Sequence, residues 1–146
     1  MSSFTRAESR KVLIVHADPT MASSLSRILS EAGFDVSVVD PRQGFAEGLL
    51  LTTYRPHVVI TGYSIGTSTG EPLCSWLLRR TSIPIVGVCD GPETLAGALM
   101  LEMGADAYVT TPISPKELVS RINSLLRRCS SSRLRQNGRA EAARQS

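Results

Sequence analysis

The stretch Pro56-His57-Val58-Val59-Ile60-Thr61-Gly62 decides the fold of this chain. Its apolar residues are consecutive rather than alternating, and they are β-branched, which is typical of a strand that is buried on both faces. Both faces are buried in parallel sheets that helices cover above and below. Ligands of such proteins bind beyond the carboxyl ends of the strands, so function should be sought from Gly62 outward.

Four further β-branched runs accompany this stretch, and segments of helical period alternate with them. We predict five strands, over Lys11 to His16, Phe34 to Asp40, His57 to Thr61, Ile83 to Val88 and Ala105 to Thr110. Strict alternation predicts an α/β fold with a doubly wound, five-stranded parallel sheet, (βα)5. The common flavodoxin-like order is 2-1-3-4-5, with the ligand crevice where the first and third strands end.

Capping residues mark where the helices start. Asp18-Pro19, Asp40-Pro41 and Ser114-Pro115 each place a capping side chain before a proline at the first helical position, and Glu117 completes a capping box with Ser114. Two apolar stripes should pack on the sheet: Met21, Leu25, Ile28, Leu29 and Ala32 in one helix, and Leu118, Val119, Ile122, Leu125 and Leu126 in another.

The positive charge is concentrated at the end of the chain. The net charge is +3, and the excess arises from residues 129–146, which hold four arginines and one glutamate. We predict a flexible terminus over residues 1–9, a domain over 10–128, and a basic, disordered tail over 129–146. The tail is interpreted as a solubilising terminus or linker stub, or alternatively as a contact for nucleic acid or an acidic partner, for which four arginines without aromatics are a weak signal.

Cysteine usage and hydropathy indicate the compartment. Cys74, Cys89 and Cys129 form no C-x-x-C pair, and an odd number of cysteines favours a reducing environment. The longest apolar run, Val12 to Val15, is far shorter than the roughly 20 residues that span a bilayer, and residues 1–6 lack the apolar core of a signal peptide. A cytoplasmic protein without a membrane segment is expected.

Several short motifs occur in a characteristic order. They are Val12-Leu13-Ile14-Val15 before an Asp-Pro, Gly33-Phe34-Asp35-Val36, Pro56-His57-Val58-Val59-Ile60, Pro84-Ile85-Val86, Gly104-Ala105-Asp106-Ala107-Tyr108-Val109, then Pro112 and the Glu117-Leu118 helix. In this combination the chain resembles, from about Arg10 to Arg128, the receiver domain of bacterial two-component response regulators.

The resemblance implies a phosphorylation site, and the chain departs from it at each usual position. The acidic pair that would hold Mg²⁺ is His16-Ala17, the phosphoacceptor aspartate is Gly62, the hydroxyl residue is Cys89, and the lysine is Thr111. Magnesium needs oxygen ligands, and phosphoryl transfer needs cations around the developing charge. We therefore predict no metal, no cofactor and no catalysis.

The predicted function is a phosphorylation-independent protein-interaction module of the pseudo-receiver type, in bacterial signal transduction or transcriptional regulation. Two receiver features are retained. Tyr108 matches the residue that in receivers moves between exposed and buried positions, and it is expected to stay in one rotamer here. Pro112 matches a proline whose preceding peptide bond is cis in the family.

Residues at the same edge of the sheet also allow metal-binding or nucleophilic alternatives. Asp18 is a helix cap or a leftover metal ligand, and His16 with Cys89 is a packing pair or a Cys-His nucleophile, which with Asp18 would form a soft-metal site. The match Gly62-Tyr63-Ser64-Ile65-Gly66 to a nucleophile elbow lacks a later histidine.

A binding role at the same edge is the main alternative. Side chains smaller than those of the family leave room around Gly62, Ser64, Cys89 and Thr111, which predicts a small-molecule or anion sensor instead of an interaction module.

The fourth helical segment carries more apolar residues than one buried face needs. Ala96, Met100 and Leu101 form the expected buried stripe, while Leu95, Leu99 and Met103 repeat beside it. The resemblance implies that the face of the fourth helix, fifth strand and fifth helix mediates dimerisation or effector docking. Leu95, Leu99 and Met103 are the candidate interface, or they merely pack under neighbouring loops.

Overall fold

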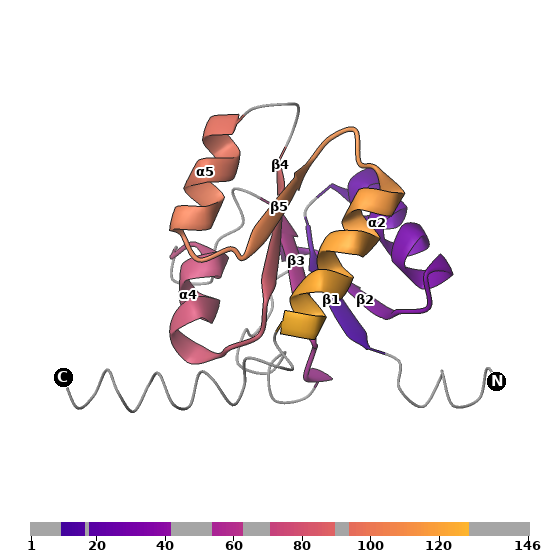
Figure 1. Cartoon of the computed structure of the whole chain (residues 1–146), viewed down its shortest axis with the longest axis horizontal. Helices are drawn as coiled ribbons and strands as arrows, with labels where there is room; N and C mark the ends of the chain where they lie inside the picture. Colours follow the sequence, from indigo (N-terminus) through magenta and orange to yellow (C-terminus); the bar gives the residue numbers. More distant parts are fainter. Residues whose placement is uncertain (1–9, 17, 42–53, 63–70, 90–93, 129–146) are drawn as a thin grey trace.

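The computed structural model describes residues 10–16, 18–41, 54–62, 71–89 and 94–128 (Figure 1). Along the chain the elements are β1 (Lys11–Val15), α2 (Pro19–Glu31), β2 (Asp35–Val39), β3 (Val58–Gly62), α4 (Leu73–Arg80), β4 (Ile85–Cys89), α5 (Thr94–Glu102) and β5 (Ala107–Thr110). A last helix follows over residues 115–128 and is called the C-terminal helix below.

The five strands form one parallel sheet in the order β2-β1-β3-β4-β5, which confirms the predicted topology. β3 lies at its centre, paired with β1 and β4, and all five of its residues are buried. Because successive side chains of a strand point to opposite faces, a strand covered on both sides must be apolar at nearly every position. This requirement explains why the apolar residues of β3 are consecutive in the sequence.

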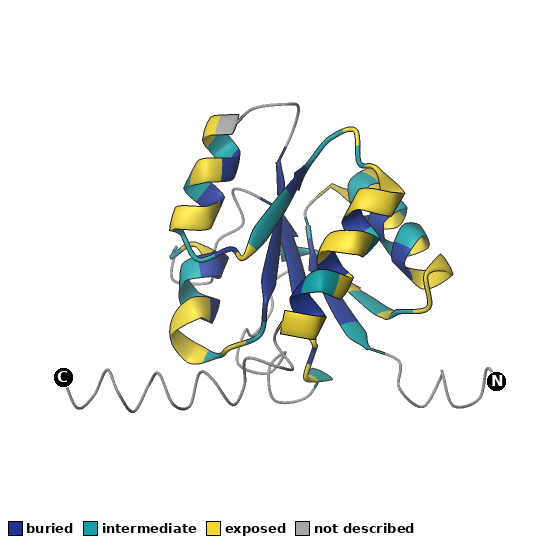
Figure 2. Cartoon of the chain, in the orientation of Figure 1, coloured by how far each residue is buried: buried dark blue, intermediate teal, exposed yellow. Residues whose placement is uncertain are grey.

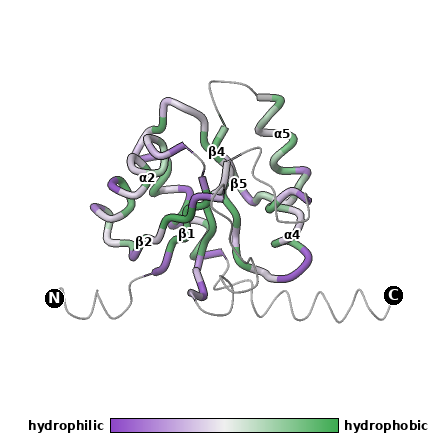
Figure 3. The backbone as a smooth tube through the Cα atoms, turned by 180° about the vertical axis from the view of Figure 1, so that it is seen from behind, coloured by the Kyte–Doolittle hydropathy of each residue, from purple (hydrophilic) through white to green (hydrophobic). Residues whose placement is uncertain are grey.

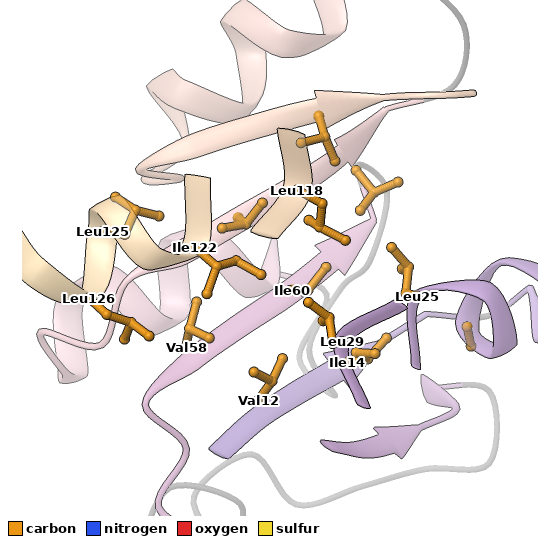
Figure 4. Packing of buried hydrophobic residues seen from close by; sticks show 14 residues of the cluster. Val12, Ile14, Leu25, Leu29, Val58, Ile60, Leu118, Ile122, Leu125 and Leu126 are labelled. Atoms are coloured by element: carbon orange, nitrogen blue, oxygen red, sulfur yellow. The ribbon is translucent and has the colours of Figure 1, made fainter. Parts of the chain in front are cut away.

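One face of the sheet is covered by α2 and the C-terminal helix. Leu25 and Leu29 of α2 meet Leu118 and Ile122 of the C-terminal helix over Ile60 of β3, and all five are fully buried (Figure 4). This packing confirms most of the two stripes predicted from the helical period. Ala32 is the exception, because it is the exposed residue that ends α2 rather than part of its buried side.

The other face is covered by α4 and α5. Leu73, Cys74 and Leu77 of α4 pack with Met100 of α5 against the opposite side of β1, β3 and β4. In Figure 2 the buried strands are enclosed between helices whose outward sides are exposed. Each sheet face therefore has its own hydrophobic cluster, and the sheet separates the two helical layers.

Two of the three predicted helix starts are confirmed, because the helices that follow them lie within the described residues. The Asp18 carboxylate accepts a hydrogen bond from the Thr20 backbone N–H at 3.0 Å, with Pro19 at the start of α2. Ser114 Oγ accepts from the Glu117 backbone N–H at 3.2 Å. The helix predicted after Asp40-Pro41, the 1–9 terminus and the 129–146 tail lie outside the described residues.

Helix α5 differs from the prediction in which side it buries. Met100 is fully buried and Ala96 half-buried, as expected, but Leu101 is 45% exposed. A helix that is apolar around its whole circumference gives no periodic signal for the side that faces the sheet. No helix among the described ranges is long and apolar enough to cross a membrane.

Candidate functional site

The carboxyl ends of β1, β3 and β4 bring together three residues singled out in the sequence. Gly62 ends β3 and is buried, His16 follows β1 directly and is half-buried, and Cys89 ends β4 and is fully buried. The strands are in register here, with Val15 opposite Thr61 and Gly62 opposite Val88. The predicted juxtaposition at this edge of the sheet is therefore present.

His16 is held by backbone bonds on both sides. Its N–H donates to the carbonyl of Val39 at 3.2 Å, and its Nδ1 accepts from the Asp18 N–H at 3.1 Å. The Asp18 carboxylate serves as the cap of α2, so the cap interpretation is confirmed and this carboxylate is turned to the helix.

The fourth and fifth strands close the other side of the edge. The Thr111 N–H donates to the carbonyl of Cys89 at 3.0 Å, and the Thr111–Pro112 peptide bond is cis, as the resemblance implied. Thr61 is fully buried, and its hydroxyl donates to the carbonyl of Gly62 at 3.4 Å. Where the resemblance calls for a lysine, this edge has the neutral hydroxyl of Thr111.

The metal-binding alternative finds no support in the part of the chain that the structure describes. Within it, no three His, Cys, Asp or Glu side chains gather closely enough to hold a metal ion. Ala17, Ser64 and the residues near Asp90 lie outside the described ranges, so the nucleophile-elbow motif and the sensor pocket are placed only in part, by Gly62, Cys89 and Thr111.

Thiol chemistry is likewise disfavoured by burial. Cys89 is fully buried at the end of its strand, and Cys74 is 2% exposed in the cluster under α4. Burial, with a smaller contribution from the Asp106 carboxylate, raises the pKa of the Cys74 thiol to about 11. A thiol that stays protonated and inaccessible is a poor nucleophile.

Tyr108 of β5 packs closely on a glycine that the sequence analysis did not single out. The half-buried ring lies against the backbone of Gly97 in α5: a Cβ built on Gly97 would stand 2.8 Å from Tyr108 Cε1 and closer still to Cε2 and Cζ. Only a residue without a side chain leaves this space to the ring. A lone glycine inside a helical pattern signals such a close approach, but it does not identify the neighbour.

The candidate interface residues of α5 are unequally exposed. Leu95 is 67% exposed, whereas Leu99 is half-buried and Met103 packs partly on the cluster under α4 and α5. Figure 3 shows hydrophobic residues along much of α5. Leu101 follows Gly97 by one turn and so lies on the flank towards β5, while the helical period puts Leu95 on the opposite flank.

Comparison with known proteins places these observations in a family. The family model "Response regulator receiver domain" matches residues 12–123. The DNA-binding response regulator MtrA of Mycolicibacterium smegmatis is 34% identical over 119 residues, which cover 82% of this chain and 51% of MtrA. The sensory transduction protein RegX3 of the same organism is 33% identical over 118 residues, covering 80% of this chain and 50% of RegX3. The chain spans about half the length of these curated relatives.

Solved structures give the same result. A response regulator from Chloroflexus aurantiacus superposes with a TM-score of 0.68 at 27% identity, covering 83% of this chain and all of the other. The BeF3-activated N-terminal receiver domain of Klebsiella pneumoniae RstA superposes with a TM-score of 0.69 at 28% identity, covering 80% and 98%. With its 2-1-3-4-5 parallel sheet and its family match over residues 12–123, this chain belongs to the response regulator receiver domain family.

Proposed function

We propose that this chain is a receiver domain that works without phosphorylation, as a cytoplasmic protein-interaction module in bacterial signal transduction or transcriptional regulation. The observation that carries the proposal is Gly62, which ends the central strand β3 at the position of the acceptor and offers no atom that attacks a phosphoryl group. Acceptor chemistry needs a nucleophile at this point of the edge, and the backbone alone supplies none.

The surroundings of Gly62 support the same conclusion. Phosphoryl transfer depends on cations that stabilise the equatorial oxygens in the transition state. The two positions that would supply them hold an imidazole, His16, whose Nδ1 is engaged by a backbone N–H, and a neutral hydroxyl, Thr111. A domain that lost only its nucleophile would keep this electrostatic setting, whereas this edge has lost its nucleophile, its metal ligands and its counter-cation together.

Intact mass spectrometry tests the proposal directly. The chain is incubated with Mg²⁺ and acetyl phosphate beside a receiver that keeps its aspartate, and both masses are recorded. We expect an adduct on the reference protein and none on this chain. A phosphoryl adduct here, mapped by peptide analysis to Asp18 or any other residue, would show that the acceptor role has moved and would overturn the proposal.

The contact surface that we propose is α5, used for self-association or for a protein partner. Leu95 and Leu101 are large, exposed and on opposite flanks of this helix, and Tyr108 of β5 adjoins the Leu101 flank through Gly97. A helix with apolar residues on every side buries one side on the sheet and leaves the others for a second contact. Leu95, Leu99 and Met103 stay the predicted interface stripe, and Leu101 adds a second flank to it.

Charge substitution on each flank decides which one is used. Leu95→Glu and Leu101→Glu are compared by sedimentation velocity over a concentration series with Leu78→Glu, a control on α4 whose 59% exposure lies between theirs. Loss of association in one α5 variant and not in Leu78→Glu identifies the flank. If all three variants associate as the unmodified chain does, self-association through α5 is ruled out.

The alternative of a small-molecule or anion sensor rests on the same missing side chain at Gly62. Thermal shift against a panel of metabolites and nucleotides distinguishes it, because a ligand that binds the native state raises the melting temperature. A saturable shift that is lost in Gly62→Val, with folding intact, would favour the sensor over the interaction module.

A further inference from the structure

A groove runs between the two helices that cover the first face of the sheet. Its volume is about 730 Å³, and it is bounded by α2 on one side and the C-terminal helix on the other. The lining residues of the C-terminal helix include positions 115, 119, 123 and 127, each four residues apart, so they form one continuous ridge. At 1.5 Å per residue this ridge is about 18 Å long.

The floor of the groove is apolar. Ile28 of α2 and Val119 of the C-terminal helix are half-buried, and both pack on the cluster beneath the helices while also lining the groove. Ala32, four residues after Ile28, and Pro115, four residues before Val119, extend the apolar lining. Side chains in this position are only partly withdrawn from water, so an apolar occupant would bury them further.

The rim is cationic. Arg27, Lys116 and Arg127 line the groove together with a single carboxylate, that of Glu31, and all four are exposed. The lining thus carries three cations against one anion around an apolar floor, which complements an apolar stripe flanked by acidic residues. The ridge of the C-terminal helix, about 18 Å long and flanked by residues 27–32 of α2, matches the side chains of a third helix, which pack as a ridge into a groove.

We propose that this groove is a docking site for an acidic amphipathic helix of a partner protein. The terminal segments of this chain do not suit it: residues 129–146 carry four arginines against one glutamate, the same sign as the rim, and residues 1–9 carry one arginine and one glutamate. A second copy does not suit it either, because α5, the most apolar of the helices that the structure describes, bears only one acidic residue, Glu102. This proposal rests on the proposed function in one respect, namely that the chain acts by binding a partner protein.

Binding of a designed peptide tests the proposal. The probe is a fluorescent peptide of about 15 residues, long enough to form a helix on binding, with leucines at i, i+3, i+4 and i+7 and glutamates beside them. Two controls share its length: one replaces the glutamates by lysines, and the other replaces the leucines by serines. Saturable one-to-one binding of the acidic apolar peptide alone is expected, and it should weaken as salt is raised.

Protein variants locate the peptide. Arg27→Glu and Lys116→Glu, both exposed, should each weaken binding by about fivefold, because an exposed ion pair is replaced by repulsion. Arg80→Glu is the matched control: it makes the same charge change on α4, across the sheet, where Arg80 stacks on Trp76. Circular dichroism confirms that each variant is folded before the titration.

Three outcomes would overturn the proposal. The first is that neither the acidic nor the basic peptide binds. The second is that Arg80→Glu weakens peptide binding as much as Arg27→Glu does, so that binding responds only to net charge. The third is that a DNA duplex displaces the peptide and Arg27→Glu weakens binding of the duplex, which would assign the basic rim to nucleic acid. None of these results depends on whether acetyl phosphate phosphorylates the chain, so the two proposals fail separately.

Discussion

The contact between Gly97 and Tyr108 gives the sharpest test of the packing of α5. Gly97→Ala should act in two opposing ways. Alanine is favoured over glycine within a helix by about 1 kcal/mol. Its Cβ, however, would stand 2.8 Å or less from the atoms of the Tyr108 ring, whereas carbon atoms in good contact lie about 3.5–4.0 Å apart. The ring would have to retreat by at least about 0.7 Å.

The magnitude follows from these two terms. Overpacking of this kind costs about 1–3 kcal/mol, so Gly97→Ala should leave the free energy of unfolding unchanged or lower it by up to about 2 kcal/mol. When Tyr108→Ala has already removed the ring, the same substitution should raise it by about 1 kcal/mol. The coupling between positions 97 and 108 is therefore about 1–3 kcal/mol, and its sign is the prediction.

Urea denaturation followed by the fluorescence of Trp76, the one tryptophan, measures all four members of the cycle. Ala98→Gly is the control, because Ala98 is exposed on the same helix and away from the ring. It should lower the free energy of unfolding by about 1 kcal/mol whether or not Tyr108 is present. If Gly97→Ala stabilises the chain equally in both backgrounds, the ring does not lie on Gly97 and the idea of a fixed Tyr108 is wrong.

Three further predictions follow from the described packing. Asp18→Ala removes the cap of α2 and should lower the free energy of unfolding by about 1 kcal/mol, while Asp18→Asn should keep most of it, as measured by urea denaturation. Gly87→Ala would place a Cβ 2.6 Å from Cε of the buried Met100, whose flexible end can shift, and thermal denaturation should show a loss of about 1 kcal/mol, the low end of overpacking costs. Because burial raises the pKa of Cys74 from 9.0 to about 11, the folded state keeps the thiol proton longer than the unfolded state. The contribution of Cys74 to the free energy of unfolding should therefore hold up to about pH 9 and fall towards pH 11, by at most about 1.4 kcal/mol per pH unit. Cys74→Ala should remove this part of the fall. The part that arises from Tyr54, whose pKa burial also raises, should remain in the variant.

The sheet was predictable because burial on both faces constrains nearly every residue of a strand. In β3, Val58 and Ile60 enter the cluster under α2 and the C-terminal helix, while Val59 enters the opposite cluster. Each of these positions must be apolar, and the β-branched residues and the flanking Pro56 distinguish the short run from a segment of buried helix. The cap at Asp18 was predictable for a similar reason, because its requirements are met within a few residues of the chain.

The orientation of α5 was not predictable in the same way. Leu101 belongs to the apolar circumference of a helix that lacks a polar side, so periodicity alone does not say whether it faces the sheet. The contact of Tyr108 with Gly97, which marks one flank of the helix, forms only in the folded chain. The groove beside Ile28 and Val119 is likewise a product of two helices that are distant in sequence.

At the candidate site, the sequence identified the residues, and the resemblance to receivers supplied their meaning. The fold confirms that His16, Gly62 and Cys89 share one edge, because parallel strands in register end together. The identity of these residues is the basis of the proposal that this edge lacks phosphotransfer chemistry. A binding function also depends on the shape of the partner, which cannot be predicted from the sequence of this chain alone.

The two proposed contact surfaces lie on opposite sides of the sheet. The groove between α2 and the C-terminal helix belongs to the first helical layer, and the exposed leucines of α5 belong to the second. The sheet and its two separate clusters stand between them, so a partner on one surface does not obstruct the other. A charge change at Arg27 should then leave association through Leu95 or Leu101 intact, and the reverse should also hold, since distant sites without shared contacts act additively. Two such surfaces would let the domain hold two partners at once, which gives the proposed interaction module a role that needs no phosphorylation chemistry.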